Sequence, residues 1–367
     1  MKETRVPVRL GHRRYEVRIG VDHLASLGPW LRRLRLGTDL IVVTNSTVLK
    51  KQGSRLRRAL AGSGMSIRFL AVPDSERSKS FEELGRLLTQ LARWDGPGKR
   101  LALLLAGGGV VGDLGGLAAG LYRRGIPCLQ LPTTLLAQVD SAIGGKTAID
   151  LPEGKNLVGL ILQPRGVFIE VGWLRTLPER QFRSGLAEML KCGVIRDARL
   201  FEELERASVR DLRRDEPRLA RLVARAVRVK AAIVEADERE TRGLRTLLNL
   251  GHTFGHALEA ATSYSGAVTH GEAVAAGMLV ATGISRRLGL ISDAPARRIR
   301  GAIERLGFRT RVRGVRPAAV RRAMSQDKKW AAGKNRWVLP VGIGRCVVRS
   351  GVGEGTVRAA IASVLEG

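Results

Sequence analysis

The sequence predicts an α/β protein in two domains, an N-terminal domain with a mostly parallel, Rossmann-like sheet and an all-α C-terminal domain. In the first half, short apolar runs alternate with helical segments, an order typical of parallel sheets. From about Leu177 onward the pattern changes to long amphipathic helices. A length of 367 residues is sufficient for two domains. We therefore place the domains at residues 1–177 and 178–367.

The predicted elements follow one another along the chain. Residues 1–17 alternate in polarity as a strand does. Further strands are predicted within residues 38–45, 66–73, 100–109, 126–134 and 165–171, with a helix at 80–94. In the second half the helical periodicity is clearest across residues 199–236, and residues 335–350 are typical of a small hairpin.

Composition restricts the classes of protein that fit. No apolar run reaches the roughly 18 residues that span a bilayer, and the N-terminal segment lacks the apolar core of a signal peptide. The three cysteines, Cys128, Cys192 and Cys346, are odd in number and far apart. They indicate neither a disulfide framework nor a thiolate metal site. We expect a cytoplasmic protein with no membrane partner.

A formal net charge of +29 suggests a nucleic-acid partner. The distribution of that charge argues against one, because residues 125–164 and 246–285, rich in glycine and histidine, contain no arginine. Aromatic residues make up only 4%, so platforms for stacking bases are scarce. We expect an arginine-rich solvated surface without a specific nucleic-acid partner, and keep a polyanion binder as the rival hypothesis.

Lysine is rare beside arginine, with 12 lysines and 51 arginines. Lysine presents a compact ammonium group that arginine cannot replace where one oxygen must be approached. Seven of the twelve fall in the stretches singled out for function: Lys79, Lys146, Lys155, Lys191, Lys230, Lys328 and Lys329. These lysines are candidates for contacts with an anionic ligand.

Two glycine-containing stretches suit anion binding. Residues 107–116, GGGVVGDLGG, follow a predicted buried strand and open a predicted helix, where the backbone can approach a phosphate. Residues 131–156 bring together Thr133 and Thr134, which suit a helix start, Asp140, a diglycine, and two lysines, with no arginine. Both stretches predict contacts with phosphate or carboxylate groups.

Three of the five histidines, His252, His256 and His270, lie within nineteen residues. Two imidazoles and one carboxylate form a three-ligand Zn²⁺ site that leaves a position open for substrate. Glu188, three residues before Lys191 on an apolar predicted helix, is a candidate carboxylate. The spacing of four favours His252 with His256, but composition alone leaves open which two histidines bind metal.

Taken together, these stretches resemble the 3-dehydroquinate synthase family of sugar-phosphate cyclases. The motifs occur in the family's order from about residue 40 to 345, and they include PDSERSK (73–79), GGGVVGDLGG (107–116), LPTTLLAQVDSAIGGKT (131–147), SGLAEMLKCG (184–193), LLNLGHTFGHALEA (247–260) and THGEAVAAGM (269–278). The resemblance implies the dehydroquinate synthase-like fold, an NAD-binding α/β domain followed by a helical domain.

The resemblance also implies roles for particular residues. Glu188, His252 and His270 would hold one divalent metal ion, zinc or cobalt, and His256 would contact substrate instead. The residues implied to contact NAD are Asn45, Asp74, Glu76, Lys79, Gly109, Val110, Val111, Gly112, Asp113, Thr133, Thr134, Lys146, Lys155, Trp173, Leu174, Arg175 and Thr176. Those implied to act on substrate are Arg124, Asp140, Lys146, Asn156, Lys191, Lys230, Arg245, Asn249, His256, Lys328 and Lys329, with Lys155 beside them.

The activity implied is the shikimate-pathway conversion of 3-deoxy-D-arabino-heptulosonate 7-phosphate to 3-dehydroquinate and phosphate. It proceeds by NAD-dependent oxidation, β-elimination, reduction and intramolecular aldol closure. The family resemblance further implies a homodimer. Two enzymatic alternatives remain: a sibling cyclase such as 2-deoxy-scyllo-inosose or epi-valiolone synthase, and an iron-dependent alcohol dehydrogenase with the same two-domain plan.

Overall fold

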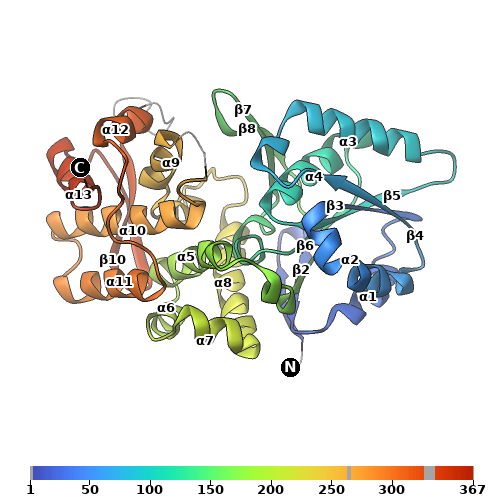
Figure 1. Ribbon diagram of the computed structural model, residues 1–367, viewed down its shortest axis with the longest axis horizontal. Coiled ribbons are helices and arrows are strands. Elements are labelled where there is room, and N and C mark those ends of the chain that lie inside the picture. The colour runs from blue at the N-terminus through green and yellow to red at the C-terminus, as the bar shows by residue number, and fades with distance from the viewer. Residues whose placement is uncertain (1–2, 263–265, 326–334, 367) are drawn as a thin grey trace. The chain divides into compact units, whose positions relative to one another are not determined.

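The computed structural model describes residues 3–262, 266–325 and 335–366. The chain forms two compact units. The first comprises Met1–Leu177 with Glu216–Glu235, and the second Pro178–Asp215 with Ala236–Gly367. The sheet with its helices in the first unit and the helical character of the second confirm the predicted fold class (Figure 1).

A seven-stranded sheet forms the centre of the first unit. Its strands lie in the order β1 (Thr4–Val8), β2 (Tyr15–Gly20), β9 (Val167–Glu170), β6 (Cys128–Pro132), β5 (Leu101–Gly107), β3 (Asp39–Asn45) and β4 (Ser66–Val72). Only β1 pairs antiparallel, with β2; the other pairs are parallel. The carboxyl ends of β3, β5 and β6 therefore meet at one edge, where ligands bind in open parallel sheets.

Helices cover both faces of this sheet, which explains the nearly continuous apolar strands. Leu40 and Val42 of β3 pack into a core with α1 (Leu27–Leu34) and α2 (Ser46–Leu60). Ile41 and Val43 face the opposite way, into a core with α3 (Phe81–Trp94) and α4 (Gly109–Leu121). Successive side chains of a strand point to opposite faces, so a strand buried on both sides shows no alternation in sequence.

The first unit contains two features that the sequence did not predict. Residues 146–161 form an antiparallel hairpin of β7 (Lys146–Leu151) and β8 (Gly154–Ile161). The hairpin packs closely on α4, since a Cβ at Gly116 would lie 2.4 Å from Thr147 Cγ2. In addition, α8 (Glu216–Ala236) belongs largely to this unit, although it follows three helices of the second unit in sequence.

The second unit is built mainly of helices. They are α5 (Glu179–Ile195), α6 (Ala198–Glu205), α7 (Val209–Arg214), α9 (His252–Ala261), α10 (His270–Arg287), α11 (Asp293–Arg305), α12 (Pro317–Ser325) and α13 (Glu354–Ala362). The predicted hairpin is present as β10 (Arg336–Gly342) and β11 (Arg345–Ser350). The periodic stretch 199–236 proves to be three helices, because Ser208 caps α7 and Asp215 ends it.

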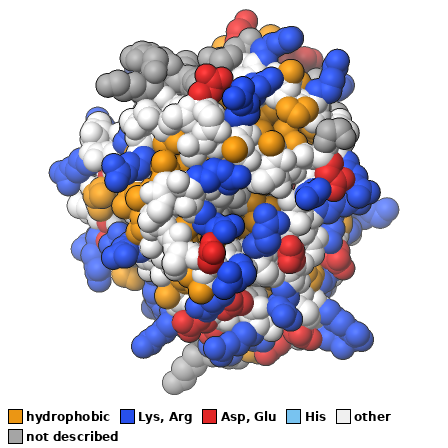
Figure 2. Space-filling model, turned by 90° about the vertical axis from the view of Figure 1, so that its left-hand side faces the viewer, with side chains coloured by type: hydrophobic (Ala, Val, Ile, Leu, Met, Phe, Trp, Pro, Cys, Tyr) orange, Lys and Arg blue, Asp and Glu red, His pale blue; other side chains and the backbone are white. Residues whose placement is uncertain are grey.

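The surface is strongly basic, but its cations are interspersed with acids. On the face shown in Figure 2, Lys and Arg side chains are spread widely, with Asp and Glu among them. Arg180 pairs with Glu272 at 2.8 Å, and Arg298 pairs with Glu205 at 2.6 Å. Among the described helices, none is long and apolar enough to cross a membrane.

Candidate functional site

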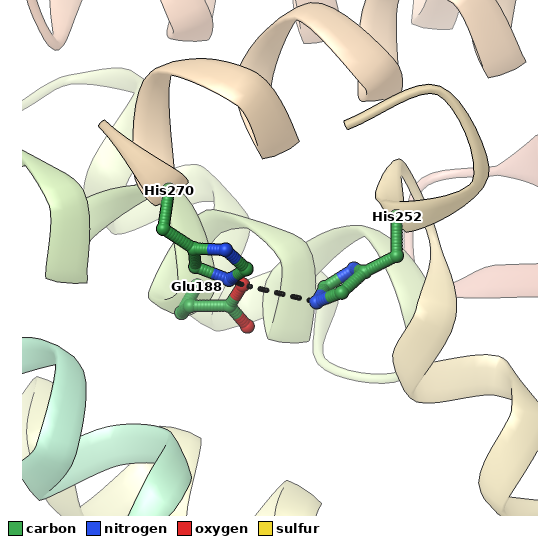
Figure 3. Close-up of side chains that lie close together, drawn as sticks. All are labelled: Glu188, His252 and His270. Carbon is green, nitrogen blue, oxygen red and sulfur yellow. Dashed lines mark ion pairs between the residues drawn. The ribbon is translucent and has the colours of Figure 1, made fainter. Parts of the chain in front are cut away.

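Three helices of the second unit bring Glu188, His252 and His270 together (Figure 3). Glu188 lies in the middle of α5, whereas His252 and His270 are the first residues of α9 and α10. Glu188 Oε1 lies 3.7 Å from His252 Nε2 and 3.5 Å from His270 Nε2. One ligand atom from each side chain lies within 4.8 Å of the others, close enough for one ion to bridge all three.

The local sequence explains why these helices begin where they do. Gly251 adopts φ +81, a left-handed conformation that favours glycine, and α9 starts at the next residue. Thr269 caps α10 through a capping box with Glu272. A Cβ at Gly271 would lie 2.3 Å from Ser184 Cα, so α10 approaches α5 at a glycine. These contacts hold His252 and His270 close to Glu188.

The electrostatics of Glu188 indicate a cation site. Its side chain is 1% exposed, as is that of Lys191, with which it forms an ion pair on the same helix. Burial raises the pKa of Glu188, but Lys191 and His270 more than offset this and lower it to about 2. Apart from the ion pair with Lys191, neither buried carboxylate oxygen accepts a hydrogen bond of acceptable geometry from the described residues. A bound divalent ion would supply the missing contacts.

The two histidines differ in their surroundings. Burial, together with the charge of Lys191, lowers the pKa of His252 well below 6.5. Burial also disfavours charge on His270, but Glu188 and Glu259 raise its pKa to about 10. In both rings Nδ1 faces an acceptor, at 3.2 Å from the Leu250 carbonyl oxygen for His252 and 3.1 Å from Glu259 Oε2 for His270.

The donor set of two imidazoles and a carboxylate fits zinc or cobalt. His256 is exposed, and its ring centroid lies 5.2 Å from that of His252 and 6.4 Å from that of His270. It is near the group but outside the three residues whose ligand atoms converge. The pair suggested by the spacing of four is therefore not the pair that the structure groups with Glu188.

The glycine-rich stretch forms the turn from β5 to α4 in the first unit. Gly108 caps the helix, and Gly109 to Asp113 form its first turn, with Val111 buried. A Cβ at Gly107 would lie 2.5 Å from Val111 Cβ, and one at Gly108 would lie 3.2 Å from Thr134 Cγ2. Backbone N–H groups at such a helix start attract anions. The turn thus has the geometry expected of a phosphate site.

Lys79 lies in an acidic cluster next to this turn. It is 4% exposed and donates to Asp113 Oδ2 at 2.8 Å and to Asn156 Oδ1. Asp150 and Glu76 lie 3.7 and 3.8 Å from its Nζ. Burial raises the pKa of Asp113 to about 6 despite the nearby lysine. The hairpin thus brings Asn156 to the predicted cofactor residues.

Other residues of the first unit that were predicted to contact NAD form hydrogen bonds or ion pairs, or are buried in the core. Asn45 caps α2 and donates to Asp74 Oδ1 at 2.9 Å, and Lys155 Nζ lies 3.5 Å from Glu76. Thr133 N donates to the Gly107 carbonyl oxygen, and Thr134 Oγ1 accepts from Ala137 N. Trp173 and Leu174 are buried, so their side chains belong to the core, and Thr176 Oγ1 accepts from Gln52.

Lys230 of α8 meets Asp140 within the first unit. Lys230 Nζ donates to the Asp140 side chain and to its carbonyl oxygen, both at 2.6 Å. Asp140 lies in the π-helical turn Ala137–Ser141, an irregularity frequent at functional sites. Lys146 begins β7 and is exposed, as is Arg124, whose φ of +62 is unusual for a non-glycine residue.

The remaining predicted residues have other contacts, or lie outside the part of the chain that the structure describes. Arg245 is 2% exposed and donates to the Glu238 carbonyl oxygen at 2.6 Å. Arg175 pairs with Asp22 at 2.8 Å and with Glu216. Asn249 ends the short helix Arg245–Asn249, three residues before His252. Lys328 and Lys329 lie outside the described residues.

Glu259 is a site residue that sequence reasoning missed. The sequence pattern that could have indicated it is its position seven residues after His252, which places both residues on the same face of one helix, two turns apart.

Comparison with known proteins places the chain in a family. Sequence models of the N- and C-terminal parts of 3-dehydroquinate synthase match residues 69–184 and 185–330. The chain belongs to the 3-dehydroquinate synthase family, in the superfamily of sugar-phosphate cyclases.

Solved structures of two sibling cyclases are similar throughout. One is 2-epi-5-epi-valiolone synthase from Streptomyces hygroscopicus subsp. jinggangensis 5008, with NAD⁺ and Zn²⁺ bound, at 29% identity and TM-score 0.85, covering 95% of each chain. Another is 2-deoxy-scyllo-inosose synthase with carbaglucose-6-phosphate, NAD⁺ and Co²⁺, at 25% identity and TM-score 0.88, covering 99% of this chain and 100% of that one. An iron-containing alcohol dehydrogenase, at 16% identity and TM-score 0.62 over 95% and 96% of the two chains, shares the fold.

Proposed function

We propose that the protein is a 3-dehydroquinate synthase, which converts 3-deoxy-D-arabino-heptulosonate 7-phosphate to 3-dehydroquinate and phosphate. The observation that carries this proposal is the converging group of Glu188, His252 and His270, with the buried Lys191 beside it, in a chain matched by both parts of the family model. Such a group suits a step in which negative charge develops on a substrate oxygen.

The residues of the second unit would hold the metal and the reacting oxygen. Glu188, His252 and His270 are the proposed ligands of one divalent ion, which supplies a Lewis acid for the substrate hydroxyl when bound. Lys191 is 1% exposed and forms an ion pair with Glu188, and its ammonium group would bind a substrate oxygen there. His256, exposed and adjacent to both other rings, would exchange a proton with substrate.

The residues of the first unit would bind NAD and anionic substrate groups. The N-terminal turn of α4 would take the pyrophosphate, because its N–H groups and the helix dipole favour negative charge. NAD supplies a hydride acceptor that is regenerated within the same turnover, so no net oxidation occurs. Lys146, exposed at the start of β7, and Lys230, held by Asp140, would meet the carboxylate or phosphate.

The similarity to the two sibling cyclases supports a second candidate, closure of a different ring from a different sugar phosphate. We favour dehydroquinate formation because Asp140, Asn156, Lys230 and Asn249 follow the dehydroquinate synthase pattern in their motifs. Two of them, Asp140 and Lys230, are paired in the structure.

A substrate panel tests the proposal. The protein, supplied with NAD⁺ and Zn²⁺ or Co²⁺, is incubated separately with the heptulosonate phosphate, glucose 6-phosphate and sedoheptulose 7-phosphate. Phosphate release and the product are measured, and NADH is followed by absorbance. We expect phosphate and dehydroquinate from the first substrate alone, without accumulating NADH. Turnover of only one of the other sugars would assign a sibling activity, and stoichiometric NADH would indicate a dehydrogenase.

A further inference from the structure

Glu259 contacts the proposed metal ligand His270 at Nδ1, the ring nitrogen on the side away from Glu188. Its side chain lies on the last turn of α9 and is largely buried, the residue being 7% exposed. Its Oε2 lies 3.1 Å from His270 Nδ1, within hydrogen-bond distance. The opposite nitrogen of that ring, Nε2, lies 3.5 Å from Glu188 Oε1. The imidazole of His270 is therefore held between two carboxylates, one on each side.

This arrangement determines which ring nitrogen can bind a metal ion. A carboxylate facing Nδ1 favours keeping a proton on that atom, so a metal ion on the side of Glu188 would bind the ring through Nε2. A negative charge at that distance also makes the imidazole a stronger electron donor.

His252 offers an internal comparison. Its Nδ1 faces a neutral acceptor, the Leu250 carbonyl oxygen at 3.2 Å, and its Nε2 also points toward Glu188. The backbone carbonyl is provided by the chain two residues earlier, whatever side chain stands there. His270, by contrast, depends on a side chain from another helix. Of the two histidines, His270 is thus the one whose orientation a single substitution can change.

We propose that Glu259 is a positioning residue that holds His270 in its metal-binding tautomer and orientation. The proposal rests on the proposed metal site and concerns metal binding alone, independent of which sugar phosphate is the substrate. Glu259 touches neither substrate nor metal in this role, and acts through the imidazole.

Three variants test it: Glu259→Ala, Glu259→Gln and, as the matched control, Thr262→Ala. Thr262 lies just beyond the same helix end, where its hydroxyl donates to the carbonyl oxygens of Leu258 and Glu259. Zinc affinity is measured by competition with a chromogenic chelator, and the visible absorption of the Co²⁺-loaded protein reports the ligand geometry. Neither measurement requires substrate.

We expect Glu259→Ala to weaken zinc binding by about 10–100-fold and to change the Co²⁺ spectrum. Glu259→Gln keeps a hydrogen-bond acceptor without the charge, so it should lie between Ala and the wild type. Thr262→Ala should bind zinc as the wild type does.

Unchanged zinc affinity and Co²⁺ spectrum in Glu259→Ala would overturn the proposal, as would an equal loss in Thr262→Ala, which would assign the effect to helix stability. A wild-type protein that bound no zinc would overturn the metal site together with the role of Glu259. Normal metal binding with no turnover of the heptulosonate phosphate would refute the proposed function alone.

Discussion

Three histidines that lie within nineteen residues are divided by their surroundings into two kinds. His252 and His270 turn Nε2 toward the buried Glu188, whereas His256 is exposed on the same helix as His252. The proposed metal ligands follow from the family resemblance, because spacing alone favours His252 with His256. A spacing of four places two residues on one helix face, but it does not reveal a third ligand contributed by another helix.

Alanine substitution of each histidine should separate these kinds. We expect His252→Ala and His270→Ala to lose tightly bound metal and activity together, since each removes a direct ligand from a three-ligand site. His256→Ala should retain metal and lose turnover. Metal content per chain after dialysis, measured beside turnover, checks this. A metal-free His256 variant with a metal-loaded His270 variant would reverse the assignment.

Zinc affinity should depend on pH through His270. Its pKa of about 10 in the metal-free protein means that it is protonated at neutral pH, and zinc must displace that proton. The pKa of His252 is lowered and that of Glu188 is about 2, so neither changes charge above neutral pH. Affinity should therefore rise by about tenfold per pH unit between about pH 7 and 9.

Competition with a chelator of known pH dependence measures this slope. A flat profile would mean that His270 is already neutral in the metal-free protein.

Glycines at helix contacts decide how the ligand-bearing helices pack. A Cβ at Gly277 of α10 would lie 1.8 Å from the carbonyl oxygen of Gly251, the residue before His252. Backbone cannot move aside as a flexible side chain can. The glycine count in the sequence indicates no such contact, because glycine is equally common in turns; residue-by-residue packing is needed to distinguish the two uses.

Gly277→Ala should therefore destabilise the second unit and its metal site together. We expect a loss of about 2 kcal/mol or more in the free energy of unfolding, with weaker zinc binding, because α10 must shift away from the start of α9. Gly301→Ala is the matched control, since Gly301 is an exposed position of helix α11 with no heavy atom within 4 Å of its Cβ site. It should be stabilising by up to about 1 kcal/mol.

Urea unfolding of both variants gives the comparison. Equal stability of Gly277→Ala and the wild type would contradict the close approach of the two backbones.

The net charge of +29 is a property of the whole molecule, and it bears on whether the protein binds nucleic acid. Its cations are interspersed with acids, as the pairs Arg180–Glu272 and Arg298–Glu205 illustrate. We expect duplex DNA to bind weakly and without sequence preference, and binding to be lost as salt is raised from about 50 to 200 mM, because diffuse phosphate contacts release counterions. Fluorescence anisotropy with two unrelated duplexes of equal length measures this. Salt-resistant binding to one duplex would favour a nucleic-acid function.

The residue pattern alone was sufficient for the fold class and for most of the elements. Buried strands and amphipathic helices are encoded locally, in the hydrophobicity of neighbouring residues, so β3, β5 and the hairpin of β10 and β11 could be predicted. The motifs were likewise sufficient to indicate the family, because their order along the chain can be read from the sequence without knowing the fold.

Tertiary structure decided everything that depends on distance between segments remote in sequence. The pairing of Lys230 with Asp140, the contact of Asn156 with Lys79, and the carboxylate of Glu259 behind His270 join residues on different elements. Whether such groups meet is set by how helices pack and where glycines allow close approach. Local periodicity contains no record of that packing, since it reports only which side of each element is apolar.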